Sequence, residues 1–448
     1  MRKNSFAFCG GAYGDEGKGR IVDEYVNTYI KKGPVVVYRD NGGANAGHTV
    51  ELSNGKRVAF HQLPSGIFHK KAVVILGKGM VIHPGDLLRE LIIVKKITKK
   101  TMPTIMIDEM ATLSLDTHRA YESALKSWQE GGKGATGRGI SPAYADILLR
   151  HPVRMRDVVS KDREVLKKHY KLYKALLTGL GVEIAKSQII TLHGTSVEVG
   201  SEHQFVEQVI KDAAKLKPYV HDISSFVEKT WNDSRYTYIF EKAQGIGLDY
   251  RWGIYPDVTA SDTTFDGIFA ATEGVIDPLD IQIRAGVIKA TYMSSVGARI
   301  LPTKMDEMLA VRIREDAYEY GATTKRPRGI AYLDIPALSY FCKVGKMNRL
   351  VLTHMDIIYP DVSVKVCVAY EKNGHVVPYR PDQKYLLTVK PVYKEFEPWD
   401  KKEIQKAKSF VRMPMAAKKF LRFMEKAIGA KIFLVTTGPR CDQSILIK

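Results

Sequence analysis

The stretch GGAYGDEGKGR, residues 10–20, constrains the fold more than any other part of the sequence, because it joins a short apolar run to a helical pattern. A phosphate-binding loop of the Walker A type reads G-x-x-x-x-G-K-[ST], and Gly17 and Lys18 match its core. Ala12 stands at the first glycine position, and Gly19 replaces the hydroxyl residue that would hold Mg²⁺. The stretch therefore predicts a modified phosphate loop between a buried strand and a helix.

Two carboxylates, Asp15 and Glu16, stand inside this loop, although its backbone N–H groups are expected to bind an anion. The glycines of the loop allow the backbone to approach a ligand closely, and Lys18 can reach a phosphate. A plain strand-to-helix turn with solvated charges is the alternative. Plain glycine turns are common, whereas D-E-G-K-G directly after a buried strand is much rarer, so the sequence favours the phosphate loop.

Short apolar runs alternate with helical patterns along the rest of the chain, which is typical of a parallel sheet covered on both faces. After the first strand, residues 5–10, a helix is expected to end at Gly33. The other expected strands are 34–40, 72–77, 236–245, 286–293, 349–356 and 431–439, with an antiparallel hairpin at 365–380. We predict an α/β fold of the P-loop-NTPase type: a large, mostly parallel central sheet covered by helices, with inserted helices and a small antiparallel hairpin, in a single domain over 1–448.

Composition adds limits rather than a function. The chain has 448 residues, 45% of them hydrophobic, and a formal net charge of +19. That charge is compatible with binding to nucleic acid, to an anionic membrane surface or to polyanionic substrates, and also with a solvated basic surface. The sequence contains no basic amphipathic helix with interleaved aromatics, so the charge alone does not indicate binding to nucleic acid. Its four cysteines form no C-x-x-C pair, and no apolar run approaches the roughly 20 residues of a membrane span. We therefore expect a cytoplasmic protein without a membrane partner.

Four further loops carry groups suited to ligand chemistry. Residues 42–49 place His48 among small residues, where it can act as a donor or acid, although a lone histidine is usually structural. Residues 134–139 offer N–H groups, a hydroxyl and a guanidinium, a set that suits phosphate or a surface turn. Residues 321–328 place three cations in four positions, which suits a small carboxylate or a solvated face. In residues 353–356 an aspartate could accept two N–H donors from guanine.

In family order, these loops resemble adenylosuccinate synthetase, which joins IMP and aspartate at the expense of GTP. The resemblance covers almost the whole chain, and GDEGKG with NAGHT in this register is highly specific. The matching segments are GDEGKG (14–19), NAGHT (45–49), ATGRGISPAY (135–144), AQG (243–245), YPDVTASDTT (255–264), GATT (321–324), YLD (332–334), THMD (353–356) and TTGP (436–439).

The resemblance implies a two-step mechanism. Asp15 would take the N1 proton of IMP, so that O6 attacks the γ-phosphate of GTP and forms 6-phosphoryl-IMP. Mg²⁺ would be bound by Asp15 and Gly47, His48 would act as an acid toward the GDP side, and Lys18 would hold the transferring group. The amine of aspartate would then displace phosphate. The implied catalytic residues are Asp15, Lys18, His48 and Gln244.

The same motif matching implies three groups of binding residues. For IMP they are Asp15, Lys18, Asn45, Ala46, Gly47, His48, Thr136, Arg150, Gln244, Thr259 and Arg326, with Arg150 lent across a homodimer interface. For L-aspartate they are Ala322, Thr323, Thr324, Lys325, Arg326 and Arg328. For GTP they are Gly14, Asp15, Glu16, Gly17, Lys18, Gly19, Gly47, His48, Thr49, Arg328, His354, Met355, Asp356, Thr436, Thr437 and Gly438.

Several positions depart from the family pattern. Ala12 and Tyr13 precede the loop, Lys325 replaces a glycine, Ser295 replaces an arginine, and His354 replaces a lysine that packs on guanine. A relative acting on dGMP or GMP is the first alternative, and retention of Asp15 argues against it, because many such enzymes carry serine there. The second alternative is a catalytically silent protein that binds nucleotides or nucleic acid, which the intact catalytic set makes less favoured.

Overall fold

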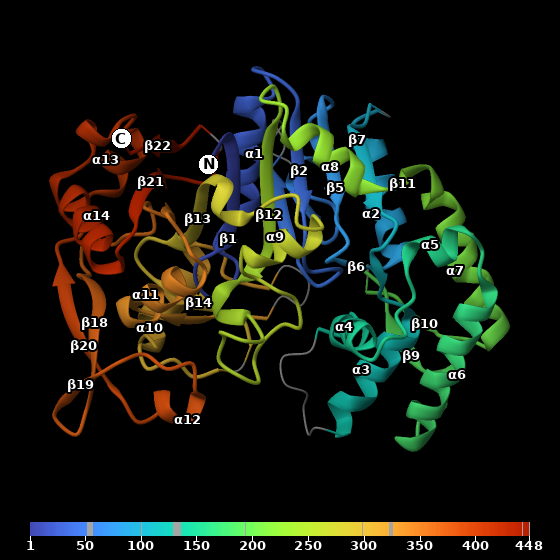
Figure 1. Cartoon of the computed structure of the whole chain (residues 1–448). Helices are drawn as coiled ribbons and strands as arrows, with labels where there is room; N and C mark the ends of the chain where they lie inside the picture. The colour runs from blue at the N-terminus through green and yellow to red at the C-terminus, as the bar shows by residue number, and fades with distance from the viewer. Residues whose placement is uncertain are drawn as a thin grey trace.

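The computed structural model describes residues 1–51, 57–99, 101–128, 136–192, 194–297, 299–321, 326–440 and 442–447. Within them, a ten-stranded central sheet runs through the molecule (Figure 1). Its neighbouring strands are parallel, apart from the last pair, which is antiparallel. From edge to edge the strands are β11 (Val220–His221), β7 (Thr104–Asp108), β5 (Ala72–Leu76), β2 (Val35–Arg39), β12 (Thr237–Gly245), β1 (Arg2–Gly10), β13 (Ile281–Lys289), β17 (Arg349–Thr353), β21 (Lys431–Thr436) and β22 (Ser444–Leu446).

The central strands are buried on both faces, as their continuous apolar runs predict. In β1, Phe6 and Phe8 pack in the cluster that also contains residues of α1 (Lys18–Tyr29), whereas Ala7 and Cys9 point into a second cluster on the opposite face. This alternation follows from the two-residue repeat of a strand. The predicted α/β architecture with a mostly parallel sheet is confirmed.

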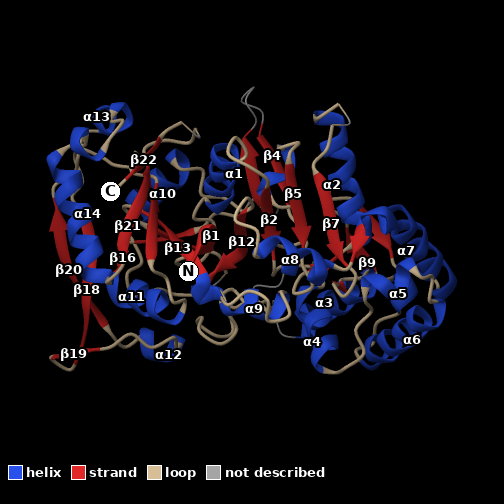
Figure 2. Ribbon diagram, turned by 45° about the horizontal axis from the view of Figure 1, so that its top comes forward, coloured by secondary structure: helices blue, strands red, loops and turns tan. Residues whose placement is uncertain are grey.

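Helices cover both faces of the sheet and extend beyond its edges (Figure 2). A helical group that includes α5, α6 and α7 lies beside the β7 edge, and α13 and α14 lie beside β21 (Figure 1). No helix among the described residues is long and apolar enough to cross a membrane. The helices after α1 are α2 (Pro84–Ile97), α3 (Asp116–Trp128), α4 (Ile140–Leu148), α5 (Met155–Val159), α6 (Arg163–Gly179), α7 (Glu202–Leu216), α8 (Ile223–Trp231), α9 (Asp266–Ala271), α10 (Glu307–Asp316), α11 (Ile335–Val344), α12 (Gln383–Leu386), α13 (Lys401–Lys406) and α14 (Met415–Ile428).

The predicted hairpin belongs to a larger unit. β18 (Val364–Lys372) and β19 (His375–Val377) are antiparallel, as expected, but β20 (Lys390–Phe396) and the parallel β16 (Leu333–Asp334) also pair with β18. The extra pairs satisfy further backbone groups of β18, and its apolar side chains pack in the same core cluster as those of α11, so the unit is more stable than a two-stranded hairpin. The other two-stranded sheets join β3 (His48–Glu51) to β4 (Arg57–Phe60), β6 (Val81–Ile82) to β8 (Thr112–Leu113), β9 (Gln188–Ile190) to β10 (Ser196–Glu198) and β14 (Met293–Ser295) to β15 (Gly329–Ala331).

Three predicted strands were too long, one of them being 431–439, which ends as β21 at Thr436. The segment 286–293 divides, because β13 ends at Lys289 and Met293 begins β14 in another sheet. The segment 349–356 ends its strand at Thr353, since His354 adopts a left-handed backbone with φ 60°. After Lys289 and after Thr353 the chain therefore leaves the central sheet. The strands β7 and β11 were not predicted, and the single domain over 1–448 stays a prediction.

Candidate functional site

The predicted loops follow neighbouring strands of the sheet. β2, β12, β1, β13, β17 and β21 are consecutive and parallel, so their carboxyl ends lie at one edge. Ligands bind at this edge in open α/β sheets. Asp15 follows β1 and lies centrally, with Asn45 and Gln244 on the β2–β12 side and Asp356 on the β17–β21 side. Five of the segments singled out in the sequence therefore converge on one site.

Glu16 is turned into its own loop. Its carboxylate accepts hydrogen bonds from the N–H groups of Gly14 at 2.7 Å and Ala12 at 3.3 Å, and it pairs with Lys18 Nζ at 2.7 Å. The residue is 2% exposed. An internal carboxylate thus satisfies N–H groups that a Walker A loop would offer to phosphate, and it fixes Lys18 at the start of α1.

Asp15 faces the opposite way. It adopts a left-handed backbone with φ 60°, and its side chain is 34% exposed. Its Oδ2 lies 2.5 Å from Nη2 of Arg328, which belongs to the predicted loop 321–328. The backbone of Arg328 is itself held, because its N–H donates to Glu319 O at 2.9 Å. The two adjacent carboxylates therefore have different surroundings: Glu16 stabilises the loop from inside, and Asp15 is partly exposed beside Arg328.

The glycine at the hydroxyl position of the Walker pattern is explained by packing. A Cβ on Gly19 would lie 2.9 Å from Ser65 Oγ and 3.5 Å from the side chain of His48. Ser65 is fixed in turn, because its N–H and its hydroxyl both donate to Glu241 at 2.8 Å. Gly19 therefore lets the loop after β2 approach α1.

His48 begins β3 and packs against α1. Burial lowers the pKa of His48, so the imidazole is neutral at neutral pH. Its Nε2 lies 4.0 Å from the carboxylate of Glu241 and is buried without a hydrogen-bond partner among the described residues. A buried ring nitrogen with unused hydrogen-bonding capacity suits contact with a ligand.

Gln244 ends β12 in a left-handed conformation with φ 59°. Its amide donates to Asn45 Oδ1 at 3.3 Å and accepts from Ser261 Oγ at 3.0 Å. Ser261 accepts in turn from the amide of Asn41 at 3.2 Å. This chain of polar groups fixes the Gln244 amide beside the loop after β2 and supports its predicted contact with a purine.

The inserted helix α4 contacts the same loop. The N–H of Gly42 donates to the hydroxyl of Tyr144 at 3.2 Å, and that hydroxyl donates to Gly79 O at 2.7 Å. Thr136 precedes α4 and is exposed, and Arg150 follows it, also exposed, with φ 67°. The predicted purine-site residues before and after α4 are therefore linked to the site through Tyr144.

The other end of the site lies between β17 and β21. Thr353 donates to Glu16 O at 2.9 Å, so the end of β17 supports the phosphate loop. The N–H of His354 donates to Thr436 Oγ1 at 3.2 Å, and the N–H of Met355 donates to Thr436 O at 3.0 Å. Asp356 is 8% exposed. The loops predicted to bind GTP are thus joined by direct hydrogen bonds.

A family model described as adenylosuccinate synthetase matches residues 7–445. The chain belongs to the adenylosuccinate synthetase family. Two relatives of that name, from Acetivibrio thermocellus and Caldicellulosiruptor bescii, are 34% and 35% identical to it over 98% and 99% of both chains. The predicted membership, and with it a ligase of this family, is confirmed.

Solved structures agree with this membership. Fully ligated adenylosuccinate synthetase from Plasmodium falciparum is similar with a TM-score of 0.86 and 29% identity, covering 99% of this chain and 100% of that one. Cyanophage S-2L succinoaminodeoxyadenylate synthetase, solved with dGMP and dATP, shares the fold with a TM-score of 0.60 and 18% identity, over 100% of this chain and 96% of its own. The P-loop-type α/β fold is therefore that of the adenylosuccinate synthetase family.

Some predicted residues lie outside the described part of the chain, and others are placed by their exposure and packing. Ala322, Thr323, Thr324 and Lys325 fall outside the described residues, as does the side chain of Thr49. Arg326 is exposed, and Gly438 packs so closely on Gln443 that a Cβ would lie 2.4 Å from its Oε1. Thr437 and Thr259 are a buried and a half-buried turn residue, and the Oγ1 of Thr259 is buried without a partner among the described residues. Their roles toward IMP, aspartate and GTP stay predictions.

Two departures from the adenylosuccinate synthetase pattern have structural explanations. Tyr13 is 1% exposed and packs edge-on against Phe341, at 5.4 Å between ring centroids, so its side chain belongs to the core. Arg299 lies 4.9 Å from the centroid of the Tyr13 ring and donates to Ser295 Oγ at 3.0 Å. A cation is therefore retained beside the serine, contributed from four positions further along the chain.

Sequence reasoning missed residues that hold the functional groups. Tyr144 and Glu319 hydrogen-bond to Gly42 and Arg328 of the predicted loops. Glu241 and Ser65 hydrogen-bond to each other beside His48 and Gly19. Tyr144 ends the matching segment ATGRGISPAY, and the other three lie in ordinary strand, turn or helix patterns. The weak signal available was a charged residue within an apolar strand, as for Glu241 in β12.

A buried cluster of His118, Asp146 and His169 has the composition of a metal site. However, His118 Nδ1 accepts from the N–H of Leu115 at 2.8 Å, so Nε2 carries the proton and donates to Asp146 at 2.9 Å. A metal-bound imidazole needs the opposite tautomer, with the proton on the other nitrogen. The cluster therefore fits a hydrogen-bonded core that joins α3, α4 and α6.

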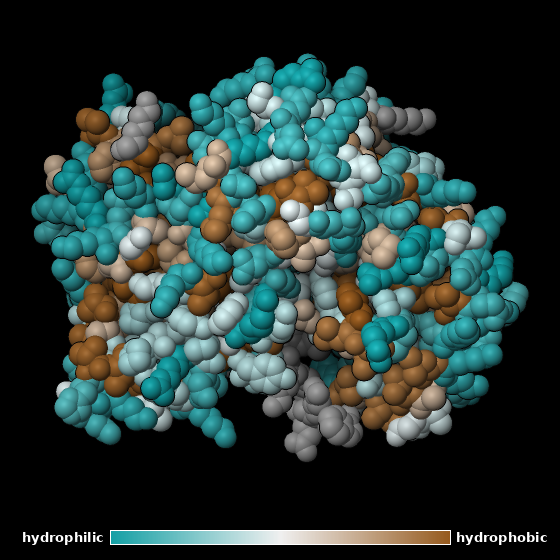
Figure 3. Space-filling view, viewed as in Figure 1, coloured by the Kyte–Doolittle hydropathy of each residue, from teal (hydrophilic) through white to brown (hydrophobic). Residues whose placement is uncertain are grey.

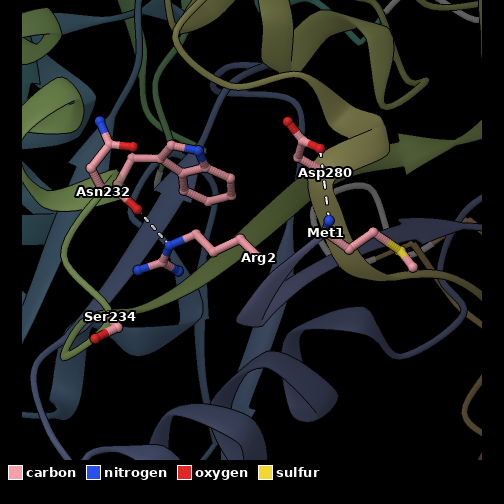
Figure 4. Close-up of a pocket in the computed structure, with 6 residues that line it drawn as sticks. Met1, Arg2, Asn232, Ser234 and Asp280 are labelled. Atoms are coloured by element: carbon pink, nitrogen blue, oxygen red, sulfur yellow. Dashed lines mark hydrogen bonds and ion pairs between the residues drawn. The ribbon is translucent and has the colours of Figure 1, made fainter.

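A surface pocket lies at the far end of β1 from this site (Figure 4). There, Arg2 donates to Trp231 O at 2.6 Å, and the amino group of Met1 lies 3.9 Å from Asp280. Arg2 begins the strand that ends at the glycine loop. Because the whole strand separates this pocket from Asp15, it takes no part in the chemistry of the site.

Proposed function

We propose that the protein catalyses the GTP-dependent ligation of L-aspartate to IMP, giving adenylosuccinate, GDP and phosphate. The observation that carries the proposal is the position of Asp15. Its carboxylate is presented at the carboxyl edge of the sheet, between the Gln244–Asn45 pair and the Asp356 loop, while Glu16 is withdrawn. One carboxylate between two nucleotide-sized groups of loops suits transfer of a phosphoryl group from one purine nucleotide to another.

Asp15 acts as the general base that takes the N1 proton of IMP, and Gln244 orients the purine ring of IMP. Lys18, held by Glu16, stabilises the transferred phosphoryl group. His48 would act as the acid toward the GDP side; because burial lowers the pKa of its imidazole, the ring must take up a proton before it can do so. The amine of aspartate then attacks C6 of 6-phosphoryl-IMP and releases phosphate. Arg328, already at Asp15, is well placed to receive a carboxylate of aspartate or a phosphate.

Mg²⁺ fits the donor set of the proposed site, because the Asp15 carboxylate and the Gly47 carbonyl are oxygen ligands of the kind it prefers. The Asp15 side chain is one-third exposed and so can be reached. When bound, Mg²⁺ neutralises charge on the phosphate oxygens. Asp15 and Gly47 would hold it, with further positions left to phosphate oxygens and water.

The remaining assignments follow the motifs. IMP would contact Asn45, Ala46, Thr136, Arg150, Thr259 and Arg326, and aspartate would contact Ala322, Thr323, Thr324, Lys325, Arg326 and Arg328. GTP would contact the phosphate loop, Thr49, His354, Met355, Asp356, Thr436, Thr437 and Gly438. The cytoplasmic location stays a prediction.

A homodimer is the proposed assembly, with Arg150 of each chain reaching the partner's purine site. Leu148 and Leu149, directly before Arg150, are 84% and 65% exposed. Apolar side chains gather on this part of the surface, over α3 and α4 (Figure 3). Exposed leucines beside an exposed arginine are typical of a surface that a partner covers.

A substrate panel tests the proposal. Phosphate release and the absorbance of a succinylated purine are measured with IMP, GMP or dGMP as acceptor and GTP or ATP as donor, each component also being omitted in turn. We expect product only when IMP, GTP, aspartate and Mg²⁺ are all present. A preference for dGMP over IMP would show that the protein acts on the substrate of the phage-type relatives. Salt-sensitive retention of RNA without turnover would indicate a catalytically silent protein that binds nucleic acid.

A further inference from the structure

A buried network of polar groups lies directly behind His354, outside the residues that the proposed mechanism uses. The hydroxyl of Tyr292 lies 2.7 Å from His354 Nδ1 and 2.6 Å from Glu319 Oε1. Lys289 pairs with the same carboxylate oxygen of Glu319 and donates to Ser294 Oγ at 2.5 Å. Tyr292, Glu319 and Lys289 are all below 5% exposed.

The direction of each hydrogen bond in the network is fixed by chemistry. Burial raises the pKa of Glu319, but the charge of Lys289 and the hydrogen bonds to its carboxylate outweigh burial and hold the pKa below its usual value. The carboxylate is therefore ionised and can only accept. Tyr292 has one hydroxyl proton, which must go to Glu319 Oε1. The Tyr292 oxygen then accepts, so Nδ1 of His354 carries the proton and Nε2 is the acceptor of the ring.

The charge state of His354 agrees with this assignment. Burial and the nearby charge of Lys289 lower the pKa of His354 to about 4, against the opposing effects of Glu319 and Asp356. The ring is neutral and lies nearly parallel to that of Tyr292, with an interplanar angle of 22° and 5.9 Å between centroids. A neutral, oriented imidazole presents a flat face and one acceptor nitrogen to the site.

Glu319 is also fixed through its backbone. Its carbonyl accepts from the N–H of Arg328, whose side chain contacts Asp15, and its own N–H donates to Arg314 O at 2.8 Å. The residue that orients Tyr292 therefore cannot shift without moving the segment that reaches Asp15. This rigidity is what a positioning group requires.

We propose that Tyr292 is a positioning residue for the nucleotide-base site: together with Glu319 it locks His354 as the Nδ1–H tautomer, so that the ring face and Nε2 are set for the base of the phosphoryl donor. The proposal rests on the assignment of the donor nucleotide to the loops after β17 and β21. Losing one buried hydrogen bond to a neutral group corresponds to about a tenfold change in affinity.

The test uses the full chain and three measurements: long-range ¹H–¹⁵N correlation of ¹⁵N-histidine-labelled protein, calorimetric binding of GDP, and turnover. His354→Gln assigns the His354 signals. We expect His354 in the wild-type chain to be the neutral Nδ1–H tautomer. In Tyr292→Phe the tautomer should change, and Kd for GDP and KM for GTP should rise about tenfold, with kcat and KM for IMP nearly unchanged.

Tyr359→Phe is the matched control, because Tyr359 lies in the same apolar cluster and its hydroxyl also donates to a carboxylate, that of Asp316, at 2.9 Å. It should change neither the His354 tautomer nor GDP affinity. A wild-type Nε2–H tautomer, or GDP affinity unaltered by Tyr292→Phe, would overturn the proposal. If Tyr292→Phe changes the tautomer and GDP affinity as expected but the wild-type chain forms no product from IMP, the role of Tyr292 is supported and the proposed reaction fails.

Discussion

Arg328 and Asp15 come from distant parts of the chain and meet in an ion pair, with Nη2 and Oδ2 2.5 Å apart. Asp15 is turned outward by a left-handed backbone, and Arg328 is the last residue of the 321–328 loop predicted to bind aspartate. A cation that already contacts the proposed base can be displaced toward an incoming anion as substrates bind. The contact thus joins the two halves of the proposed reaction, phosphoryl transfer and capture of aspartate.

Asp15→Asn should lower turnover by about 10²–10⁴-fold, the usual contribution of a general base. Asparagine is among the side chains that best tolerate φ near 60°, so the loop should keep its conformation. Steady-state turnover with IMP, GTP and aspartate, alongside circular dichroism, measures the effect. Asp23→Asn, on α1 where Asp23 pairs with His69, should leave turnover close to wild type. Turnover of the Asp15→Asn variant at the wild-type rate would show that Asp15 is not the general base.

Glu16→Gln should act on stability. The Glu16 carboxylate accepts from two loop N–H groups and from Lys18 in a buried position, so losing its charge should lower the free energy of unfolding by about 1–3 kcal/mol. Urea unfolding measures the change. Glu273→Gln breaks an exposed pair with Lys78 and should change stability by about 0–1 kcal/mol. Equal effects of the two substitutions would contradict the internal role of Glu16.

Gly19→Ala should be harmful, although alanine favours helices. The added Cβ would meet Ser65 Oγ at 2.9 Å, and overpacking of this kind typically destabilises by about 1–3 kcal/mol. The added Cβ would also lie 3.5 Å from the side chain of His48, so turnover should fall as well. Gly179→Ala is the control: nothing lies within 4 Å of a Cβ there, so the substitution in α6 should be neutral or stabilising. Thermal unfolding of both variants measures these changes in stability, and a Gly19→Ala variant as stable as Gly179→Ala would contradict the packing explanation.

Stability should decrease as pH falls below the ordinary histidine value of 6.5. Burial lowers the pKa values of His118, His169 and His354, so between each lowered pKa and 6.5 the unfolded chain binds more protons than the folded one. Stability is therefore fully present above 6.5 and is lost on acidification, by up to about 1.4 kcal/mol per pH unit for each histidine.

Replacing one of these histidines isolates its share. His169→Gln should reduce the loss of stability between about pH 7 and pH 5 relative to wild type, because one buried group no longer gains a proton on unfolding. Urea unfolding at several pH values measures the slope for both chains. The difference between the chains cancels contributions of opposite sign, such as that of Asp334, whose pKa burial raises to about 6. Equal slopes would show that His169 does not contribute.

Leu149→Asp should weaken self-association. Leu149 is 65% exposed next to Arg150, and a charge in the covered centre of an interface is unfavourable. Sedimentation velocity over a range of concentrations measures the shift toward monomer, and turnover should fall with it if the partner supplies Arg150. Leu387→Asp changes a leucine with 58% exposure after α12 and should leave association unchanged. A monomeric wild-type chain would exclude the shared arginine.

The sequence by itself determined the class of fold and predicted where the candidate site lies. Apolar runs such as 72–77 predict buried parallel strands because both faces of such strands avoid water, and ligands bind where parallel strands end. The motifs around Asp15, Asn45 and Asp356 therefore predict a site at the edge where the parallel strands end. These signals are local, since a glycine turn or an apolar run depends only on neighbouring residues.

Tertiary structure decided what each group does within that site. The sequence places Asp15 and Glu16 side by side, but only backbone conformation and packing turn Glu16 inward to Gly14 and Asp15 outward to Arg328. In the same way, Gly19 is explained by Ser65, and the tautomer of His354 by Tyr292 and Glu319. These contacts join segments distant in sequence, and their directions follow from burial and hydrogen-bond geometry, which no local pattern specifies.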